Sequence, residues 1–337
     1  MNPFAPARDF LDLTLQGLTP QQAAWHTPAL QAQWLGHGLL QLTPLAANSQ
    51  QEQILLSTGI HGNETAPIEI LNSIVNDLLA GTLPLACRIL VVLGNIPAMQ
   101  SGKRFVDYDM NRLFDGAHAK QPDASEARRA VALEQAASAF FATAPAGAPR
   151  RHYDLHTAIR GSVFERFAIY PFIHQRPHNR EQLAWLRAAD VDTVLLHSKP
   201  AATYSYYTSE RCGADAFTLE LGKARPFGQN DLTRFTGIEH ALRELLSGQR
   251  QPAANPDISG IRLFKAKYDI IKHSGEFVLH LADDVENFTA LPHGMTIAED
   301  VEVRYVADGG EERILFPNPK VGVGLRAGIV IEPASLD

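Results

Sequence analysis

The segment His61-Gly62-Asn63-Glu64 carries two side chains that can bind a metal ion, three positions apart and shortly after the apolar run at 54–56. His156 ends a second apolar run, and Glu220 lies within a third. Two histidines and one glutamate suit a catalytic zinc ion, which keeps a further coordination position open. A free glutamate beside such an ion can act as a general base toward water. These residues predict a zinc hydrolase with His61, Glu64 and His156 as ligands of one zinc ion per subunit and Glu220 as the base.

These side chains are expected at the carboxyl ends of strands, where open α/β sheets bind their ligands. Asp154 faces the same side of its strand as His156 and could orient a ligand histidine. Taken alone, each signal has an ordinary alternative. An H-x-x-E pair often begins a solvated helix, an interior histidine usually finds a hydrogen-bond partner, and Glu220 could pair with Lys223 or Arg225. The ordered combination at predicted strand ends favours the metal site.

A second concentration of functional side chains lies in residues 103–114. Arg104 and Arg112 flank a short apolar and acidic stretch, and Asn111 adds an amide donor. Because a guanidinium binds a carboxylate through two parallel hydrogen bonds, this loop could hold an anionic substrate and polarise a carbonyl group. The alternative is a surface loop whose arginines pair with neighbouring aspartates such as Asp109.

The composition is that of an ordinary globular protein and argues against several classes of partner. The chain has 337 residues, enough for a sizeable core and for two domains. Its net charge of −7 argues against a nucleic-acid-binding protein, which needs a basic face. No apolar run is long enough to span a membrane, and no secretory signal is evident. Cys87 and Cys212 lie far apart in the sequence and are expected as reduced thiols in a cytoplasmic protein.

Apolar runs and helical periodicities alternate along much of the chain. A short helix at 19–24 and a hairpin at 33–42 are expected first. This alternation predicts an α/β fold, with a mixed, mostly parallel sheet flanked by helices. The predicted strands lie at 53–58, 87–93, 153–156, 167–170, 193–197 and 216–221. The predicted long helices lie at 64–80, 125–143, 179–189 and 231–246.

The composition changes near residues 248–256, where glycine, proline and polar residues predict a linker. We therefore predict two domains, a catalytic domain over residues 1–250 and a β-rich domain over residues 255–337. The β-rich domain is expected to help shape the mouth of the pocket. Alternatively, it could be a carbohydrate- or partner-binding module. Its short strands are predicted at 261–266, 277–279, 301–306 and 328–331.

Four motifs, taken in order, resemble one family of zinc enzymes. They are G-I-H-G-N-E at 59–64, R-F-V-D-Y-D-M-N-R-L-F at 104–114, D-L-H-T-A at 154–158 and T-L-E-L-G at 218–222. Together they resemble the succinylglutamate desuccinylase and aspartoacylase branch of the zinc carboxypeptidase superfamily. The β-rich tail fits the same branch, and the run that begins at Asp154 is most similar to its desuccinylases.

The resemblance implies hydrolysis of the amide bond of N-succinyl-L-glutamate to succinate and L-glutamate, a step of arginine catabolism. It implies the zinc ligands and base named above, with Arg104 stabilising the oxyanion and with Asn111 and Arg112 holding a substrate carboxylate. Because this substrate carries several carboxylates, Arg160 is a further candidate for binding it. The implied partner is a small anionic N-acyl amino acid. The sequence leaves open whether the chain forms a homo-oligomer.

The motifs do not fix the acyl group, so two related activities stay open. One is an aspartoacylase-like deacylase of another N-acyl amino acid, and the other is a zinc carboxypeptidase. A different class is a non-catalytic metal-binding or scaffolding protein. Arg104 and Glu220 distinguish that class from an enzyme, since a structural metal site needs neither a base nor an open coordination position.

Overall fold

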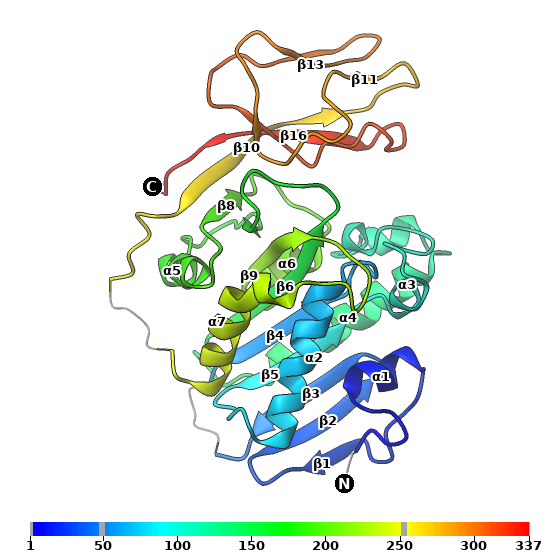
Figure 1. Cartoon of the computed structure of the whole chain (residues 1–337), viewed down its shortest axis with the longest axis vertical. Coiled ribbons are helices and arrows are strands. Elements are labelled where there is room, and N and C mark those ends of the chain that lie inside the picture. Colours follow the sequence, from blue (N-terminus) through cyan, green and yellow to red (C-terminus); the bar gives the residue numbers. More distant parts are fainter. Residues whose placement is uncertain (1–2, 47–50, 251–254, 337) are drawn as a thin grey trace.

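The computed structural model describes residues 3–46, 51–250 and 255–336, and one large mixed sheet runs through this part of the chain (Figure 1). In spatial order its central strands are β3 (Leu39–Pro44), β5 (Arg88–Leu93), β4 (Gln53–Thr58), β6 (Arg150–Ala158), β9 (Asp215–Lys223), β7 (Phe167–Tyr170) and β8 (Thr193–Leu196). Strands β5, β4, β6 and β9 are parallel to one another, whereas β7 runs antiparallel to β9. The carboxyl ends of β4, β6 and β9 therefore meet at one edge of the sheet.

Further strands extend the sheet on both sides. At one end lie β2 (Leu30–Gly36) and β1 (Ala24–His26). At the other end lie β10 (Arg262–Ile271), β16 (Arg326–Pro333), β15 (Arg313–Leu315) and β12 (Thr289–Ala290). A second, small sheet contains β11 (Val278–Leu279), β13 (Thr296–Glu299) and β14 (Arg304–Val306). The α/β class, with a mixed sheet flanked by helices and a small C-terminal β region, is confirmed. The expectation of mostly parallel strands holds for the centre of the large sheet but not for the whole of it, because the described edge strands pair antiparallel.

Helices cover both faces of the central strands (Figure 1). One face packs against α1 (Phe10–Leu15), α2 (Thr65–Ala80), α5 (Arg180–Ala188) and α7 (Thr236–Ser247), and the other against α4 (Ser125–Ala142) and α6 (Tyr204–Cys212). In β4, Ile54 and Leu56 join the first core while Leu55 joins the second. Burial on both faces explains the uninterrupted apolar run that predicted this strand. The remaining helices are α3 (Ile96–Ser101), η1 (Met110–Arg112), η2 (Ala117–Lys120) and η3 (Leu232–Phe235).

Helix α2 shows how the sequence specifies these elements. Ile70, Ile74 and Leu78 recur at helical spacing, and all three are buried against the sheet. Gly81 follows the last turn in the left-handed conformation, with φ 77°, which ends the helix at little steric cost. The amino end of α2, at Thr65, follows the short loop after the carboxyl end of β4.

The predicted helix at 19–24 is wrong. Residues 24–26 form β1, which pairs antiparallel with β2, and the helix of this region lies earlier as α1, capped by Asp9. Pairing with a neighbouring strand outweighs the local helical pattern here. In the C-terminal region, β14 begins only at Arg304, later than predicted. Of the predicted linker at 248–256, residues 251–254 lie outside the described residues.

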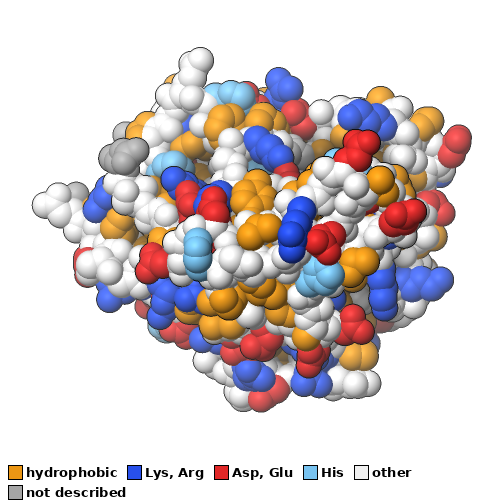
Figure 2. Space-filling model, turned by 90° about the horizontal axis from the view of Figure 1, so that it is seen from above, with side chains coloured by type: hydrophobic (Ala, Val, Ile, Leu, Met, Phe, Trp, Pro, Cys, Tyr) orange, Lys and Arg blue, Asp and Glu red, His pale blue; other side chains and the backbone are white. Residues whose placement is uncertain are grey.

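Acidic, basic and apolar side chains are interspersed over the face of the molecule seen in Figure 2. Cys87 and Cys212 are buried and not bonded to each other. None of the helices in the described part of the chain combines the length and apolar character needed to cross a bilayer.

Candidate active site

The three predicted metal ligands converge at the carboxyl ends of β4 and β6. His61 lies in the loop after β4, Glu64 directly precedes α2, and His156 lies on β6. Nδ1 of His61 lies 3.0 Å from Oε1 of Glu64, and Nδ1 of His156 lies 2.9 Å from Oε2 of the same carboxylate. One ligand atom from each residue lies within 4.8 Å of the others, and all three residues are buried. This group, called the ligand cluster below, could hold one metal ion.

Gly62 allows the loop of the ligand cluster to approach helix α3 closely. A Cβ atom at this position would lie 2.2 Å from the backbone carbon of Ala98 and 2.2 Å from the amide nitrogen of Met99. The amide of Gly62 also donates a hydrogen bond to the carbonyl oxygen of Arg104 at 3.1 Å. Because any side chain would push these backbones apart, glycine fixes the ligands on either side of it against the loop that carries Arg104.

Carboxylates fix the second nitrogen of each imidazole. Nε2 of His61 lies 2.9 Å from Oδ1 of Asp109, and Nε2 of His156 lies 2.9 Å from Oδ2 of Asp154. Both rings therefore turn Nδ1 toward Glu64. Contacts of this kind orient metal-binding histidines and raise their basicity. The sequence pointed to Asp154 for this role but not to Asp109, which comes from a separate loop.

Asp154 is itself held by a buried chain of polar side chains. Oγ of Ser57 donates to Oδ1 of Asp154 at 2.5 Å and lies 2.7 Å from Nε2 of His152. Nδ1 of His152 lies 2.7 Å from Oγ1 of Thr208 on α6. Burial lowers the pKa of His152 to about 4, so this ring is neutral near pH 7. The chain therefore fixes Asp154 without adding positive charge beside it.

Nδ1 of His61 and Oε2 of Glu220 are among the buried polar atoms at the site that have no hydrogen-bond partner within the described ranges. The nitrogen lies close to Glu64, but its ring is not aligned for a hydrogen bond. An unpaired buried polar atom costs about 1–3 kcal/mol. A metal ion held by His61, Glu64 and His156 would satisfy this nitrogen. The residues present therefore fit such an ion.

Glu220 lies beside the ligand cluster on β9, opposite His156 in the register of β6 and β9. Burial raises the pKa of Glu220 to about 7, and the negative charge of Glu64 acts in the same direction. The pairing of Glu220 with Lys223 or Arg225, which the sequence left open, does not occur among the residues that the structure describes. A buried carboxylate of this kind can accept and return a proton near neutral pH.

Opposite charges dominate the electrostatics of the ligand cluster. Burial alone would raise the pKa of Glu64, but His61 and His156 outweigh it and hold this pKa below its usual range. Burial alone would lower the pKa of His156, but Asp154 and Glu64 raise it well above its usual value. The cluster therefore favours positive charge at its centre, which protons or a metal ion can supply.

Arg104 contacts the ligand cluster from the segment 103–115, which the sequence predicts to bind the substrate and which is called the substrate loop below. Its Nη1 donates to Oε1 of Glu64 at 2.7 Å, and its Nη2 lies 3.7 Å from Oδ2 of Asp109. The side chain is 28% exposed, so one side of the guanidinium can be reached from solvent. The surface pairing considered from the sequence is thus present in part, but it occurs at the predicted metal ligands.

Asn111 and Arg112 occupy different environments within η1 of the substrate loop. Asn111 is buried, and its Oδ1 accepts a hydrogen bond from the amide of Tyr204 at 3.0 Å. Arg112 is exposed, and its Nη1 donates to the carbonyl oxygen of Asn111 at 2.8 Å. The structure therefore holds one end of the Asn111 amide and leaves the Arg112 guanidinium accessible.

Glu126 on α4 anchors the substrate loop and was not found from the sequence. Its Oε1 accepts hydrogen bonds from the amide of Val106 at 2.7 Å and from Nδ2 of Asn95 at 3.0 Å, and its Oε2 accepts from the amide of Asp107 at 3.2 Å. Burial would raise the pKa of Glu126, but these hydrogen bonds lower it. An acidic residue in the first turn of a helix usually interacts with the helix dipole. The sequence therefore provides no reason to expect that Glu126 anchors the loop.

Arg160 lies away from the substrate loop, at the boundary with the C-terminal region. Its guanidinium donates to the carbonyl oxygen of Asp283, in the segment between β11 and β12. The structure shows this domain contact for Arg160 and no direct contact with the ligand cluster within the described residues. Its predicted role in substrate binding stays a prediction.

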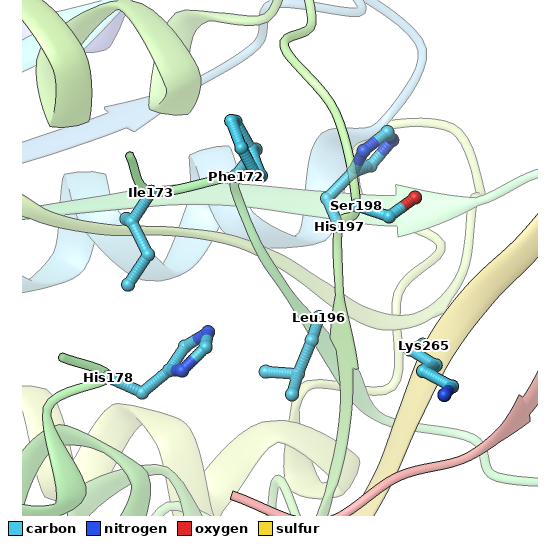
Figure 3. Close-up of a pocket in the computed structure, with 7 residues that line it drawn as sticks. All are labelled: Phe172, Ile173, His178, Leu196, His197, Ser198 and Lys265. Carbon is cyan, nitrogen blue, oxygen red and sulfur yellow. The ribbon is translucent and has the colours of Figure 1, made fainter. Parts of the chain in front are cut away.

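A pocket of about 170 Å³ lies beyond the ends of β7 and β8 (Figure 3). None of the predicted site residues lines it, so it is separate from the ligand cluster. Its walls combine apolar side chains with two imidazoles and one ammonium group. The lining residues are Phe172, Ile173, His178, Leu196, His197, Ser198 and Lys265.

Two family models match consecutive parts of the chain. The model described as the succinylglutamate desuccinylase/aspartoacylase catalytic domain matches residues 50–246. The model described as the AstE/AspA barrel-sandwich hybrid domain matches residues 259–334. Among curated relatives, the succinylglutamate desuccinylase of Chromobacterium violaceum is 58% identical over 317 residues, which cover 94% of each chain. That of Burkholderia lata is 52% identical over 96% of this chain and 92% of its own.

Solved structures agree with these matches. The crystal structure of the succinylglutamate desuccinylase from Chromobacterium violaceum has a TM-score of 0.87 and 55% identity, covering 97% of this chain and 98% of its own. That from Vibrio parahaemolyticus has a TM-score of 0.90 and 30% identity, covering 97% and 96%. Both the catalytic and the C-terminal parts are therefore matched in sequence and in fold. The chain belongs to the succinylglutamate desuccinylase/aspartoacylase family.

Proposed function

We propose that this chain hydrolyses the amide bond of N-succinyl-L-glutamate to succinate and L-glutamate, with one zinc ion per subunit, as a step of arginine catabolism. The observation that carries the proposal is the convergence of His61, Glu64 and His156 beside the unpaired carboxylate of Glu220. Relatives up to 58% identical bear the name of this activity. Imidazole and carboxylate ligands suit zinc among the common divalent ions.

Glu220 supplies the proton transfers of the proposed reaction. When bound by the ligand cluster, a zinc ion would polarise the amide carbonyl and acidify a water molecule. Glu220 takes the proton of the attacking water and then passes it to the departing amine of glutamate. Burial, which raises the pKa of this carboxyl to about 7, favours both steps near neutral pH. A structural metal site would not need such a base, so its presence favours catalysis over scaffolding.

Positive and amide groups of the substrate loop orient the substrate in this proposal. Arg104, which reaches Glu64 from the loop, stabilises the negative charge that develops on the carbonyl oxygen. Asn111 and Arg112 bind a substrate carboxylate. Because Oδ1 of Asn111 already accepts a hydrogen bond from the amide of Tyr204, the NH2 group of Asn111 is the part that donates to the substrate. Arg160 is retained as a further, peripheral binding residue.

We infer the same two-domain division that the sequence suggests, over residues 1–250 and 255–337. The family matches at 50–246 and 259–334 support it, and the C-terminal part contacts the catalytic part through Arg160 and through β10. A cytoplasmic location is also proposed, supported by two free and buried thiols.

A substrate panel on zinc-loaded protein tests the proposed function. Initial rates are compared for N-succinyl-L-glutamate, N-acetyl-L-aspartate and a short peptide with a free carboxyl terminus. We expect kcat/KM to be at least about tenfold higher for succinylglutamate, because its acyl carboxylate adds a charge-assisted contact. A preference for acetylaspartate would instead indicate an aspartoacylase-like deacylase, and release of a terminal amino acid would indicate a carboxypeptidase.

Removal of the metal tests the cofactor separately. Dialysis against a chelator should abolish hydrolysis, and added Zn²⁺ should restore it. Far-UV circular dichroism should change little, because the two main cores lie in the sheet and its helices rather than at the ligand cluster. Undiminished turnover in protein shown to contain no metal would contradict the zinc mechanism.

A further inference from the structure

Two cations share one carboxylate where the C-terminal region approaches the end of β8. Arg326 begins β16, and its Nη1 lies 3.5 Å from Oδ1 of Asp269 on β10. Lys199, two residues beyond His197 in the segment after β8, forms an ion pair with Oδ2 of the same aspartate. Lys199, Asp269 and Arg326 are called the distal cluster below. It carries more positive than negative charge.

The segment that carries Lys199 continues directly to the substrate loop. The carbonyl oxygen of Ala202 accepts a hydrogen bond from the amide of Phe114 at 3.2 Å. Two residues later, the amide of Tyr204 donates to Oδ1 of Asn111 at 3.0 Å. Since only a few residues separate Lys199 from these contacts, the distal cluster lies near η1, which carries Arg112.

Electrostatics supports the same placement. Burial lowers the pKa of Arg326, and the positive charge of Arg112 lowers it further. Like charges interact in this way only when they are close and weakly screened. Arg112 and Arg326 therefore lie close enough for their charges to interact, one on the catalytic part and the other on the C-terminal part.

A purely structural role does not account well for Arg326. Lys199 already joins the segment after β8 to β10 through Asp269. The ion pair of Arg326 with Asp269 is long, at 3.5 Å, and the arginine side chain is still 27% exposed. The three cations Lys199, Arg326 and Arg112 lie near two carboxylates, Asp269 and Asp109, so positive charge is in excess and an anion can balance it. The arrangement consequently has the character of an anion subsite.

We propose that Arg326, assisted by Lys199, binds the side-chain carboxylate of a dicarboxylic amino acid in the substrate, while Asn111 and Arg112 bind its α-carboxylate. The inference rests on the proposed function and deepens it. The two carboxylates of glutamate are joined by a short carbon chain, which matches two neighbouring cationic groups on different elements. The C-terminal region thus contributes directly to recognition of the amino acid that is released.

The test compares wild type with Arg326→Met and Arg326→Lys on three substrates: N-succinylglutamate, N-succinylglutamine and N-acetylglutamate. Succinylglutamine replaces the side-chain carboxylate by a neutral amide, and acetylglutamate lacks the acyl carboxylate. For Arg326→Met we expect kcat/KM for succinylglutamate to fall by about 10- to 100-fold, mostly through KM, as for loss of a charge-assisted hydrogen bond. The preference for succinylglutamate over succinylglutamine should collapse, and Arg326→Lys should restore part of it.

The matched control is Arg304→Met, which removes an exposed arginine on β14 of the same region. It should leave all three rates unchanged. An equal loss on every substrate would give Arg326 a structural role, and no loss on any substrate would exclude it from substrate binding. Either result would overturn the proposal. Collapse of the preference for succinyl over acetyl would assign Arg326 to the acyl carboxylate and overturn the proposal. If wild type hydrolysed only acetylglutamate, the proposed function would fail, yet comparison of acetylglutamate with acetylglutamine would still test Arg326.

Discussion

Oδ1 of Asp109 lies 2.9 Å from Nε2 of His61, and Oδ2 of the same carboxylate lies 3.7 Å from Nη2 of Arg104. One side chain thus links a predicted metal ligand to the residue proposed to stabilise the oxyanion. Burial would raise the pKa of Asp109, but His61 and the neighbouring arginines hold it well below its usual range. Asp109 therefore stays ionised and can orient both partners.

Asp109→Asn should weaken zinc binding by about 10- to 100-fold, because an amide orients the imidazole less strongly than a carboxylate does. Competition with a chromogenic chelator measures this affinity. Asp123→Asn, an exposed substitution before α4, is the matched control and should bind zinc as wild type does. Equal affinities for the two variants would contradict the orienting role of Asp109.

Gly62→Ala should lower both zinc affinity and kcat/KM. The added methyl group would meet the backbone of Ala98 and Met99 at 2.2 Å, so the loop must shift. Overpacking of this kind also costs about 1–3 kcal/mol of unfolding free energy. Gly275→Ala, where no atom lies within 4 Å of the new methyl group, is the control. The expectation fails if urea denaturation and zinc titration give the same values for both alanine variants.

Glu220→Gln should reduce kcat by at least ~10², which is the usual effect of removing a general base. The side chain is not one of the three ligands that converge on the metal position, so zinc content should be preserved. Metal analysis and steady-state kinetics on the same preparation check both statements. Glu311→Gln, an exposed change in the C-terminal region, should leave turnover intact. Near-normal turnover of Glu220→Gln would remove Glu220 from the mechanism.

The stability of chelator-treated protein should depend on pH through Glu220. Burial raises the pKa of this carboxyl from 4.5 to about 7 in the folded protein. Below about pH 4.5 both folded and unfolded forms are protonated, whereas at higher pH only the unfolded form ionises readily. The free energy of unfolding should therefore fall between pH 4.5 and 7, by on the order of 3 kcal/mol. Guanidinium denaturation at several pH values should show this component in wild type but not in Glu220→Gln.

Glu126→Gln should loosen the substrate loop. The carboxylate accepts hydrogen bonds from the amides of Val106 and Asp107, and a glutamine NH2 placed there would face other donors. We expect a loss of about 1–3 kcal/mol of stability, together with a higher KM because Arg104 and Arg112 belong to the same loop. Glu302→Gln, an exposed substitution between β13 and β14, is the control. A KM unchanged from wild type would indicate that Glu126 supports only the fold.

Residues at the ends of buried strands could be predicted from the sequence, because apolar runs locate the strands and parallel strands end at one edge. His61, His156 and Glu220 all belong to this class. Asp109, Glu126 and Arg326 could not be found in this way. Their partners lie far away in the sequence, and their own neighbours are typical of exposed loops and helix ends. The misplaced first helix has a related cause, since the pairing of β1 with β2 is a tertiary contact.

Strand β10 pairs in parallel with β8, from Arg262 opposite Thr193 to Lys265 opposite Leu196. The C-terminal region therefore continues the catalytic sheet and is not joined to it by a linker alone. Truncation of the chain before β10 would expose the backbone hydrogen-bonding groups at the edge of β8, and this exposed edge would promote aggregation. Truncation is therefore a poor way to study this region, and point substitutions are preferable. Any transplant of the region onto another enzyme would have to preserve this strand register.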